Sequence, residues 1–389
     1  MASTPLANLR LTHLKLENWR NFSRAEADLA RRVFVVGPNA SGKSNFLGAL
    51  RFLHDIVAVG GGLEHAVRKR GGVKPIRCLA ARRYPEVAIA VRIGNDEEPA
   101  LWEYKVSFNQ DQQRRLRIQQ ERVATRGRNL LDRPNKTDRE DPARLTQTYL
   151  EQIQANKSFR PVADFFKEIH YLHVIPQIVR EPERFTGRQE DPYGGDFLEQ
   201  IAGTNKRTQS ARLRRIQKAL RVAVPQLHSL EPYRDDRGHP HLRGKYEHWR
   251  PEGAWQDEAQ FSDGTLRLMG LLWAVLEGRG PLLLEEPELS LHPDVVRFIP
   301  EMLARVQRKS KYRKQILLST HSSDLLRGGG IGIDEVLLLI PSAEGTEVRP
   351  ASDFREIPVL LEQGLSMAEA VMPKTRPARA HQLPLFPDE

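Results

Sequence analysis

Apolar and polar residues follow strand-like patterns in the first third of the chain. Residues 11–19 alternate, which predicts a first strand, and the continuous apolar run at 32–36 predicts a buried strand. Beyond residue 44, apolar side chains recur at helical spacing, which predicts a helix. Further strands are predicted to form an antiparallel sheet beside this unit, at residues 87–93, 101–108 and 116–123.

The middle of the chain is more polar and is predicted to be mainly helical. Residues 129–141 are charged and contain Pro134, so we expect an exposed loop there. Residues 142–227 predict helices interrupted by one short strand at 169–175. Residues 234–260 predict turns and strands.

Buried strands return in the second half of the chain. An apolar helix at residues 268–276 precedes an apolar strand that begins at residue 281 and ends in the paired carboxylates 285 and 286. A helix comes next, followed by another buried strand that begins at residue 315 and ends in the histidine at 321, and residues 335–340 predict the last strand. Residues 372–389 are rich in proline and charge, which predicts a disordered tail.

The junction between the buried strand at 32–36 and the helix after it carries a P-loop. Two glycines four residues apart, followed by lysine and serine, allow backbone N–H groups to surround phosphates. The lysine reaches the terminal phosphates and the serine ligates Mg²⁺. The candidate nucleotide-binding residues are Gly37, Pro38, Asn39, Ala40, Ser41, Gly42, Lys43 and Ser44.

Polar side chains also end the two later buried strands. Glu285 and Glu286 follow an apolar run, where two acids are costly unless they serve a metal or a reaction. One carboxylate is expected to hold Mg²⁺ and the other to polarise the attacking water. His321 ends the next strand and is a candidate catalytic residue. Ser262 and Gly264 open the apolar helix, where an anion can bind.

Composition narrows the possible partners and compartments. The 389 residues have a net charge of +10, which favours polyanions and above all nucleic acid. The single cysteine, Cys78, permits no disulfide within the chain, which fits a reducing cytoplasm. We expect a cytoplasmic protein without a signal peptide, because no apolar run is long enough to span a membrane.

Two basic segments are candidates for phosphate contacts. The helix expected at residues 210–224 lies in a stretch without any acidic residue. Its basic residues are Arg212, Arg214, Arg215, Lys218 and Arg221. These side chains either contact a nucleic-acid backbone or form a solvated helix face. The loop at residues 68–72 carries the same two alternatives.

The order of these motifs resembles an ABC-type ATPase. The P-loop, the segment Phe261 to Arg267, the carboxylate-ended strand and the segment Ser319 to Ser322 are similar to the four motifs of that family. The opening strand and the P-loop with Asn45 resemble the SMC/RecF branch. Residues 285–293 are closest to the OLD-like predicted AAA ATPases, many of which are encoded in anti-phage systems.

The resemblance implies an α/β ATPase head with a mixed central sheet carrying the P-loop, a flanking antiparallel sheet and a helical insertion. Residues 1–345 would form the head, 142–228 an inserted helical arm and 346–389 a C-terminal extension. The resemblance also implies an ATP- and Mg²⁺-dependent homodimer, or a higher oligomer, arranged head to tail.

Within that dimer, the resemblance assigns a role to each candidate residue. ATP would lie between one P-loop and Ser262, Asp263 and Gly264 of the other subunit. Glu285 would hold Mg²⁺ with Ser44, Glu286 would orient the water and His321 would sense the γ-phosphate. Gln177 is similar to the family's lid glutamine and would reach the metal.

Several features depart from the pattern of the family. Glu285 stands where aspartate is usual, and Asp263 stands where many signatures have glycine. The longer Glu285 side chain leads us to expect slow turnover, which suits a switch. We expect no nuclease domain after His321, so an effector would be a separate protein. Without paired cysteines, a zinc-hooked coiled coil is excluded.

The tail ends in a short apolar motif. Gln382, Leu383, Leu385 and Phe386 are similar to the peptide by which bacterial proteins dock on the replication sliding clamp. Apolar side chains in an exposed tail have no core to join, which motivates this hypothesis. The alternative is an unstructured tail end.

Three functions remain open at this stage. The first is an ATPase that dimerises on ATP and couples this to DNA sensing or to a separate effector in anti-phage defence. The second is a nucleotide-gated scaffold that holds a toxin or nuclease with negligible hydrolysis. The third is a RecF-like DNA-repair ATPase, which the clamp-like tail would support.

Overall fold

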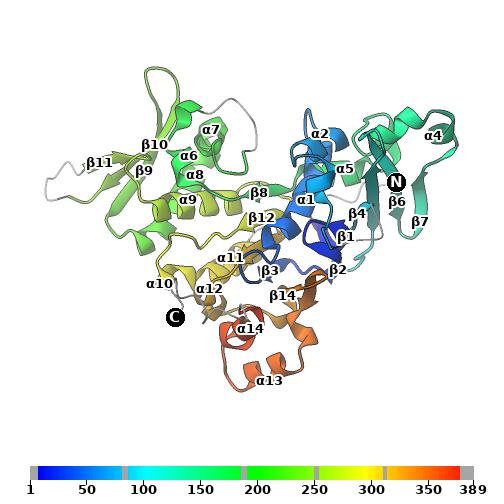
Figure 1. Cartoon of the computed structure of the whole chain (residues 1–389). Helices are drawn as coiled ribbons and strands as arrows, with labels where there is room; N and C mark the ends of the chain where they lie inside the picture. The colour runs from blue at the N-terminus through cyan, green and yellow to red at the C-terminus, as the bar shows by residue number, and fades with distance from the viewer. Residues whose placement is uncertain (1–7, 81–85, 185–190, 249–253, 310–312, 377–389) are drawn as a thin grey trace, which may run out of the picture.

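The structure is a computed structural model, which describes residues 8–80, 86–184, 191–248, 254–309 and 313–376. A central sheet carries the P-loop, and two other sheets flank it at opposite sides of the molecule (Figure 1). The C-terminal helices lie below the central sheet in this view. No helix in the described part of the chain combines the length and the apolar character that a membrane crossing requires.

The central sheet has six strands in the order β15-β14-β3-β13-β12-β8. Every neighbouring pair is parallel except β14 and β15, so the sheet is mixed. The strands are β3 (Arg32–Val36), β8 (His170–Leu172), β12 (Leu282–Glu285), β13 (Ile316–Thr320), β14 (Val336–Ser342) and β15 (Gly345–Pro350).

Both faces of the central sheet are buried, which explains its continuous apolar strands. In β3, Val33 and Val35 join the hydrophobic core on one face, while Phe34 and Val36 join the core on the other. The first core also contains helices α1 (Lys43–Val57), α2 (Leu63–Arg68) and α5 (Arg160–Lys167). The long apolar helix α9 (Asp263–Leu276) belongs to the second core.

The flanking sheet is antiparallel and has the order β2-β1-β4-β5-β6-β7. Gln315 joins it to the central sheet, because its side-chain amide exchanges hydrogen bonds of 2.8 and 2.7 Å with the backbone of Leu11. The strands are β1 (Arg10–Trp19), β2 (Phe22–Asp28), β4 (Val87–Gly94), β5 (Trp102–Gln110), β6 (Leu116–Thr125) and β7 (Arg128–Arg133).

A small sheet and several helices complete the molecule. The three strands are β9 (Leu227–Arg234), β10 (Pro240–Tyr246) and β11 (Ala254–Asp257). The other α-helices are α3 (Val73–Ile76), α4 (Lys136–Glu140), α6 (Pro176–Val179), α7 (Phe197–Gly203), α8 (Lys206–Ala223), α10 (Pro293–Val296), α11 (Ile299–Lys309), α12 (Ser323–Arg327), α13 (Glu356–Glu362) and α14 (Met367–Thr375). Short 3₁₀-helices are η2 (Pro142–Thr146), η3 (Ala155–Ser158), η4 (Pro182–Arg184), η5 (Ile333–Glu335) and η6 (Ala351–Asp353).

The α/β fold class and the strands predicted near the N-terminus are confirmed. The exposed loop predicted at residues 129–141 is wrong, because β7 and α4 occupy this segment. Two charged residues of this segment, Arg133 and Asp138, belong to a buried cluster of ion pairs. Arg133 is bonded at 2.8 Å to both Glu121 and Asp138, and the side chains of all three are fully buried. Pairing removes the cost of burying each charge alone.

Two predictions at the C-terminal end also need correction. The strand at 335–340 is not the last, because β15 pairs with it and α13 and α14 follow. The disordered tail predicted from residue 372 begins too early, since α14 continues to Thr375 and buries Met367 and Val371 in the core. The clamp-like residues Gln382, Leu383, Leu385 and Phe386 lie outside the described residues.

The segment 142–228 does not consist of helices alone. Its strand β8 pairs with β12 and so belongs to the central sheet. The strand is also shorter than the predicted 169–175, and its backbone leaves the sheet after Leu172. Helix α8 and strand β9 then pack together beside α9.

Candidate functional site

The candidate site lies where three parallel strands end. Val36 of β3 pairs with Thr320 of β13, and Ser319 of β13 pairs with Glu285 of β12. The residues that follow these strands therefore emerge at the same edge of the sheet. This register brings together Gly37, Glu286 and His321, although they lie far apart along the chain.

The lysine of the P-loop is hydrogen-bonded to backbone carbonyl groups of the same loop. The Lys43 ammonium donates to the carbonyl oxygens of Gly37 at 3.0 Å and Pro38 at 3.1 Å, and its side chain is almost entirely buried. Gly42 precedes α1 with a φ of +96°, a conformation that glycine adopts without a steric penalty. A Cβ on Gly37 would lie 2.5 Å from the Ser41 hydroxyl, so the loop requires glycine there too.

Glu285 is held by residues from α1, from β8 and from the segment just after β8. Its carboxylate accepts hydrogen bonds from the hydroxyls of Ser44 and Tyr171. Its backbone carbonyl lies 3.1 Å from Nδ1 of His173. Burial raises the pKa of the Glu285 carboxyl, and the bond from Ser44 opposes that shift.

Glu286 lies between the P-loop lysine and the strand-end histidine. Its Oε1 is 2.9 Å from His321 Nδ1 and 3.6 Å from Lys43 Nζ. Its φ is +43°, an uncommon value for a residue with a side chain. Its backbone N–H donates to the Ser319 carbonyl at 3.1 Å, which continues the strand pairing into the turn. The left-handed backbone then directs the carboxylate toward Lys43 and His321.

The residues of this edge fit ATP with Mg²⁺. Ser44 and Glu285 supply adjacent oxygen atoms, the ligand type that Mg²⁺ prefers. The buried Ser41 hydroxyl has no hydrogen-bond partner within the described residues, which leaves it free for a ligand. Ala40, at a φ of +63°, and Asn39 form the exposed tip of the loop, and the N-terminus of α1 points at the same place.

Ser262 is the N-cap of helix α9. This helix belongs to the hydrophobic core on the opposite face of the central sheet from α1. Its hydroxyl caps the helix by accepting from the Thr265 N–H at 3.2 Å. Asp263 accepts from Arg180 at 2.6 Å and from the Gln177 amide at 3.5 Å. A Cβ on Gly264 would lie 2.5 Å from the Ser290 carbonyl, so a larger residue does not fit.

The hydrogen bond that the structure gives Gln177 is thus to Asp263, beside the predicted anion site. Gln177 opens the short helix α6, whose next turn carries Arg180 to the same carboxylate. Its role as a metal ligand remains a prediction.

Sequence reasoning missed several residues around the site. Tyr171 and His173 contact Glu285, and the Arg51 guanidinium lies 4.7 Å from the centre of the Tyr171 ring. Asn21 accepts from the Asn45 amide and donates to the Ala40 carbonyl at 3.3 Å. The position of Tyr171 follows only from the pairing of β8 with β12, which no local pattern indicates.

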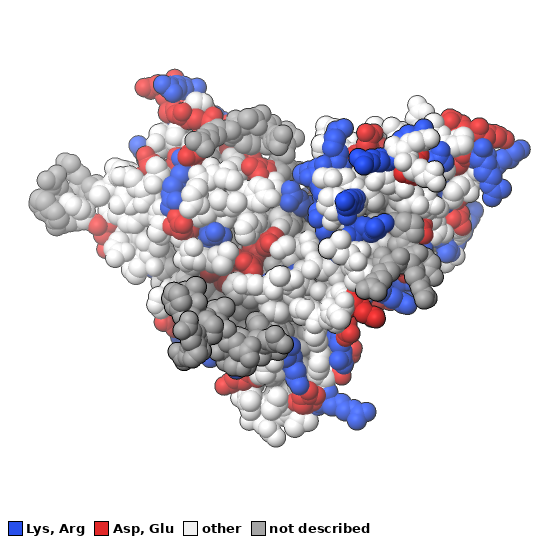
Figure 2. Space-filling model, viewed as in Figure 1, with Lys and Arg blue, Asp and Glu red and all other residues white. Residues whose placement is uncertain are grey.

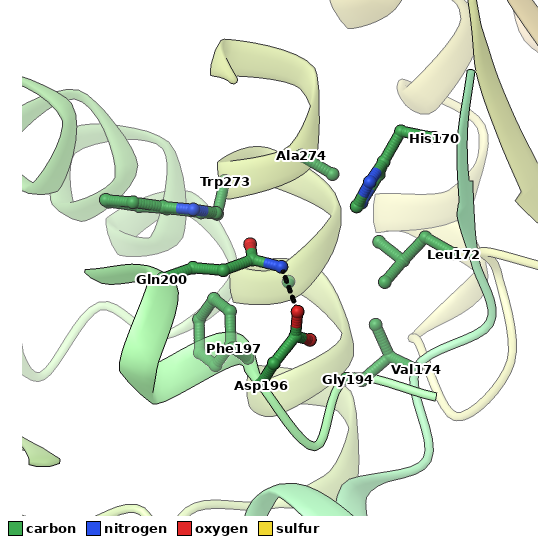
Figure 3. Close-up of a pocket in the computed structure, with 10 residues that line it drawn as sticks. His170, Leu172, Val174, Gly194, Asp196, Phe197, Gln200, Trp273 and Ala274 are labelled. Carbon is green, nitrogen blue, oxygen red and sulfur yellow. Dashed lines mark hydrogen bonds between the residues drawn. The ribbon is translucent and has the colours of Figure 1, made fainter. Parts of the chain in front are cut away.

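A small cavity lies beside the site, between β8, α7 and α9 (Figure 3). Its lining is mostly apolar and includes Leu172, Val174 and Trp273. The Gln200 amide donates to Asp196 at 2.7 Å across one wall. The Phe197 and Trp273 rings meet edge to face at 6.5 Å beside this cavity, so we assign the cavity to the packing of α7 on α9.

The predicted basic helix corresponds to α8, and its basic side chains are not uniformly exposed. Leu213, Ile216 and Leu220 of α8 are buried as predicted. Arg212 is wrongly placed on the polar side, because its guanidinium lies 5.0 Å from the Trp273 ring and 3.4 Å from Glu277. Of the five predicted basic residues, Arg214, Arg215, Lys218 and Arg221 are exposed.

Lysines and arginines also gather over α1 and α2 (Figure 2). Two members of the predicted basic loop are engaged within the protein, since Lys69 and Arg70 lie 3.0 and 2.8 Å from Asp55. Arg68 is exposed. Lys69 and Arg70 therefore attach this segment to α1 through Asp55, while Arg68 remains in contact with solvent.

The fold and the site define a P-loop ATPase of the ABC type. Residues 32–327 match the family model described as "AAA domain, putative AbiEii toxin, Type IV TA system", and the chain belongs to this family. Membership implies ATP as the ligand, with Mg²⁺. No curated protein matches the chain.

Solved structures with the same fold are SMC heads. An Smc head bound to the C-winged helix domain of ScpA is 13% identical, with a TM-score of 0.54 over 87% of this chain and 97% of that one. An Smc head derived from Pyrococcus furiosus, bound to the C-terminal domain of ScpA, is 10% identical, with a TM-score of 0.51 over 92% and 100%. An Smc head derived from Pyrococcus yayanosii is also 10% identical, with a TM-score of 0.50 and the same coverage. These likenesses establish the fold of an SMC-type head.

Proposed function

We propose that this chain binds ATP at its P-loop and hydrolyses it slowly, using Glu286 to orient the attacking water. The observation that carries the proposal is the position of the Glu286 carboxylate, 3.6 Å from Lys43 Nζ and 2.9 Å from His321 Nδ1. A carboxylate between a phosphate-binding lysine and a histidine is placed to accept a proton from water beside the terminal phosphate.

The other residues of the edge have separate tasks. Lys43 binds the terminal phosphates, and Ser44 with Glu285 would hold Mg²⁺, which neutralises phosphate charge when bound. His321 contacts the γ-phosphate and keeps Glu286 in place. Glu285 is one methylene longer than the usual aspartate, and the Tyr171 hydroxyl restrains that extra length.

We further propose that two chains form a head-to-tail dimer around ATP. Ser262 and the backbone N–H of Gly264 would face the γ-phosphate bound by the partner subunit, and Asp263 would be held back by Arg180. The capped N-terminus of α9 supports this role, because it offers N–H groups and partial positive charge to an anion.

The output we propose is control of a separate effector in anti-phage defence. The family description names a toxin of a type IV toxin–antitoxin system, which favours a defence role over DNA repair. DNA is the proposed trigger, since the chain carries a net charge of +10 and exposed basic side chains on α8. A nucleotide-gated scaffold without turnover is the alternative.

The deciding experiment measures phosphate release and oligomeric state in parallel. We expect slow ATP turnover by the wild-type protein, an ATP-dependent dimer, and loss of turnover in Glu286→Gln. A wild-type rate equal to that of Glu286→Gln would favour the scaffold. Adding duplex DNA tests the trigger: an unchanged rate and unchanged dimerisation at low salt would rule DNA out.

A further inference from the structure

Glu288 is a buried acid two residues beyond Glu286 in the turn that follows β12. Its side chain is only 6% exposed, and burial raises the pKa of its carboxyl. One carboxyl oxygen, Oε1, accepts from the Thr320 hydroxyl at 2.5 Å. The other has no hydrogen-bond partner within the described residues. Burying such a group costs free energy, so the position is poorly suited to stability alone.

The partner of Glu288 adjoins the histidine of the site. Thr320 is the last residue of β13, its side chain is fully buried, and it immediately precedes His321. The same Thr320 hydroxyl oxygen accepts from the Ser322 N–H at 3.0 Å. One hydroxyl therefore bridges Glu288 to the backbone on the far side of His321.

The backbone after His321 is also fixed. Ser322 caps α12, since its hydroxyl accepts from the Leu325 N–H at 3.3 Å. His321 thus sits between a strand end held by Glu288 and the first turn of a helix. Its ring meets Glu286, which comes from the same turn as Glu288. The turn after β12 therefore contacts the end of β13 at two side chains, through Glu288 at the Thr320 hydroxyl and through Glu286 at the His321 ring.

We propose that Glu288 is a positioning residue that acts through Thr320 to set the His321 ring against Glu286. This inference rests on the proposed ATPase function. Glu288 is buried, and we propose that it acts only through Thr320. Loss of its bond to Thr320 lets the His321 turn shift, so Glu286 loses its partner at 2.9 Å. The chemical step slows while ATP binding at the P-loop is retained.

The test is a double-mutant cycle measured by steady-state ATP turnover. Glu288→Met, which removes the oxygen that accepts from Thr320, and Thr320→Val should each lower kcat by about tenfold and leave KM for ATP within about twofold. In a His321→Ala background, Glu288→Met should have no further effect, because the residue that Glu288 positions is gone. An equal tenfold loss in both backgrounds would overturn the proposal.

Two controls separate positioning from folding. Thr320→Ser keeps the hydroxyl and should retain wild-type kcat, whereas Thr320→Val should not. Glu301→Gln changes a surface acid paired with Arg305 on α11 and should leave turnover and thermal melting unchanged. A loss of kcat in Thr320→Ser equal to that in Thr320→Val would show that packing, and not the hydroxyl, matters.

A readout without turnover keeps this inference separate from the ATPase proposal. In histidine-labelled protein, the ring ¹⁵N signals of His321, assigned with His321→Ala, should shift alike in Glu288→Met and Thr320→Val. Unmoved signals would overturn the positioning role even if the enzyme is active. Moved signals with no wild-type ATP turnover would support the positioning contact while refuting the proposed function.

Discussion

The P-loop side and the α9 side of the site differ in where their side chains find partners. On the P-loop side, Ser44 bonds to Glu285, which is 241 residues later in the chain, and Lys43 lies 3.6 Å from Glu286. On the α9 side, the polar contacts of Ser262 and Asp263 within the described residues are to Thr265, Arg180 and Gln177. None of these three belongs to the P-loop or to the carboxylate turn.

The difference in side-chain partners indicates which part of the proposed ATP site each side supplies within one subunit. The parallel sheet brings the residues proposed to bind phosphate, to hold the metal and to orient water together at one edge of a single subunit. The α9 side presents a capped helix N-terminus without those groups. We therefore expect substitutions on the P-loop side to affect nucleotide binding, and those on the α9 side to affect only assembly and turnover.

The largest effect is expected for Lys43→Ala. Removing the buried ammonium leaves the phosphates without their main charge partner and the Gly37 and Pro38 carbonyls without their donor. ATP affinity should fall by about a hundredfold or more, near 3 kcal/mol, in isothermal titration calorimetry. The exposed Lys74→Ala is the matched control. Tight ATP binding by Lys43→Ala would contradict the assignment of the P-loop.

Glu286→Gln should rank next. The amide retains size but cannot accept a proton from water, so turnover should fall by about 10²- to 10³-fold while ATP still binds. We expect a stable ATP-bound dimer, measured by light scattering after size-exclusion chromatography. A variant that stays monomeric with ATP would separate binding from assembly and weaken the dimer proposal.

Ser262→Arg tests the α9 side directly. A long charged side chain at the helix N-terminus should block the partner's nucleotide and lower turnover by at least about tenfold, with ATP affinity of the single subunit unchanged. Ser366→Arg removes an equivalent cap from α14 and should leave turnover intact. If Ser262→Arg weakens ATP binding as strongly as it slows turnover, the α9 side also contributes to ATP binding, and the proposed division of roles between the two sides is wrong.

A smaller effect is expected for Tyr171→Phe, which removes one hydroxyl from Glu285. Groups that orient a metal ligand commonly change metal affinity by about tenfold. We expect about tenfold more Mg²⁺ for half-maximal turnover and little change in ATP affinity, measured by Mg²⁺ titration. No change in Mg²⁺ dependence would mean that Ser44 alone orients Glu285.

Lys314→Met should have the smallest effect on turnover and a pH-dependent effect on stability. Lys314 Nζ donates to the carbonyls of Ala274 and Glu277 at the end of α9, and burial lowers its pKa to about 8. The unfolded chain keeps the usual, higher pKa, so folding is penalised while the group is charged. The penalty is present below pH 8 and disappears as pH rises from about 8 to 10.5.

The free energy of unfolding of the wild-type protein, measured relative to that of Lys314→Met, should therefore rise by on the order of 3 kcal/mol between pH 8 and pH 10.5. Denaturant unfolding of both proteins at a series of pH values measures this difference. A difference that stays constant with pH, or falls as pH rises, would exclude this titration as its source.

Motifs that depend on local spacing were predictable, whereas the partners of those motifs were not. The P-loop, the carboxylate pair and the strand-end histidine could be located because strand, turn and helix patterns are local. The β7 strand was missed because Arg133 is neutralised by Glu121, twelve residues away, and by Asp138. The Arg212 side chain was misplaced because Trp273 and Glu277 lie on another helix.

The sequence by itself placed Gly37 to Ser44, Glu285, Glu286 and His321 at the ends of predicted strands, and the order of these motifs resembles that of an ATPase head. Spacing and hydrophobic period suffice for the placement, since both arise from backbone geometry. Only the tertiary structure decided that Tyr171 bonds to Glu285, that Arg180 bonds to Asp263, and that the Thr320 hydroxyl bonds to Glu288. Those contacts depend on which strands and helices become neighbours, and burial of both sheet faces sets that choice.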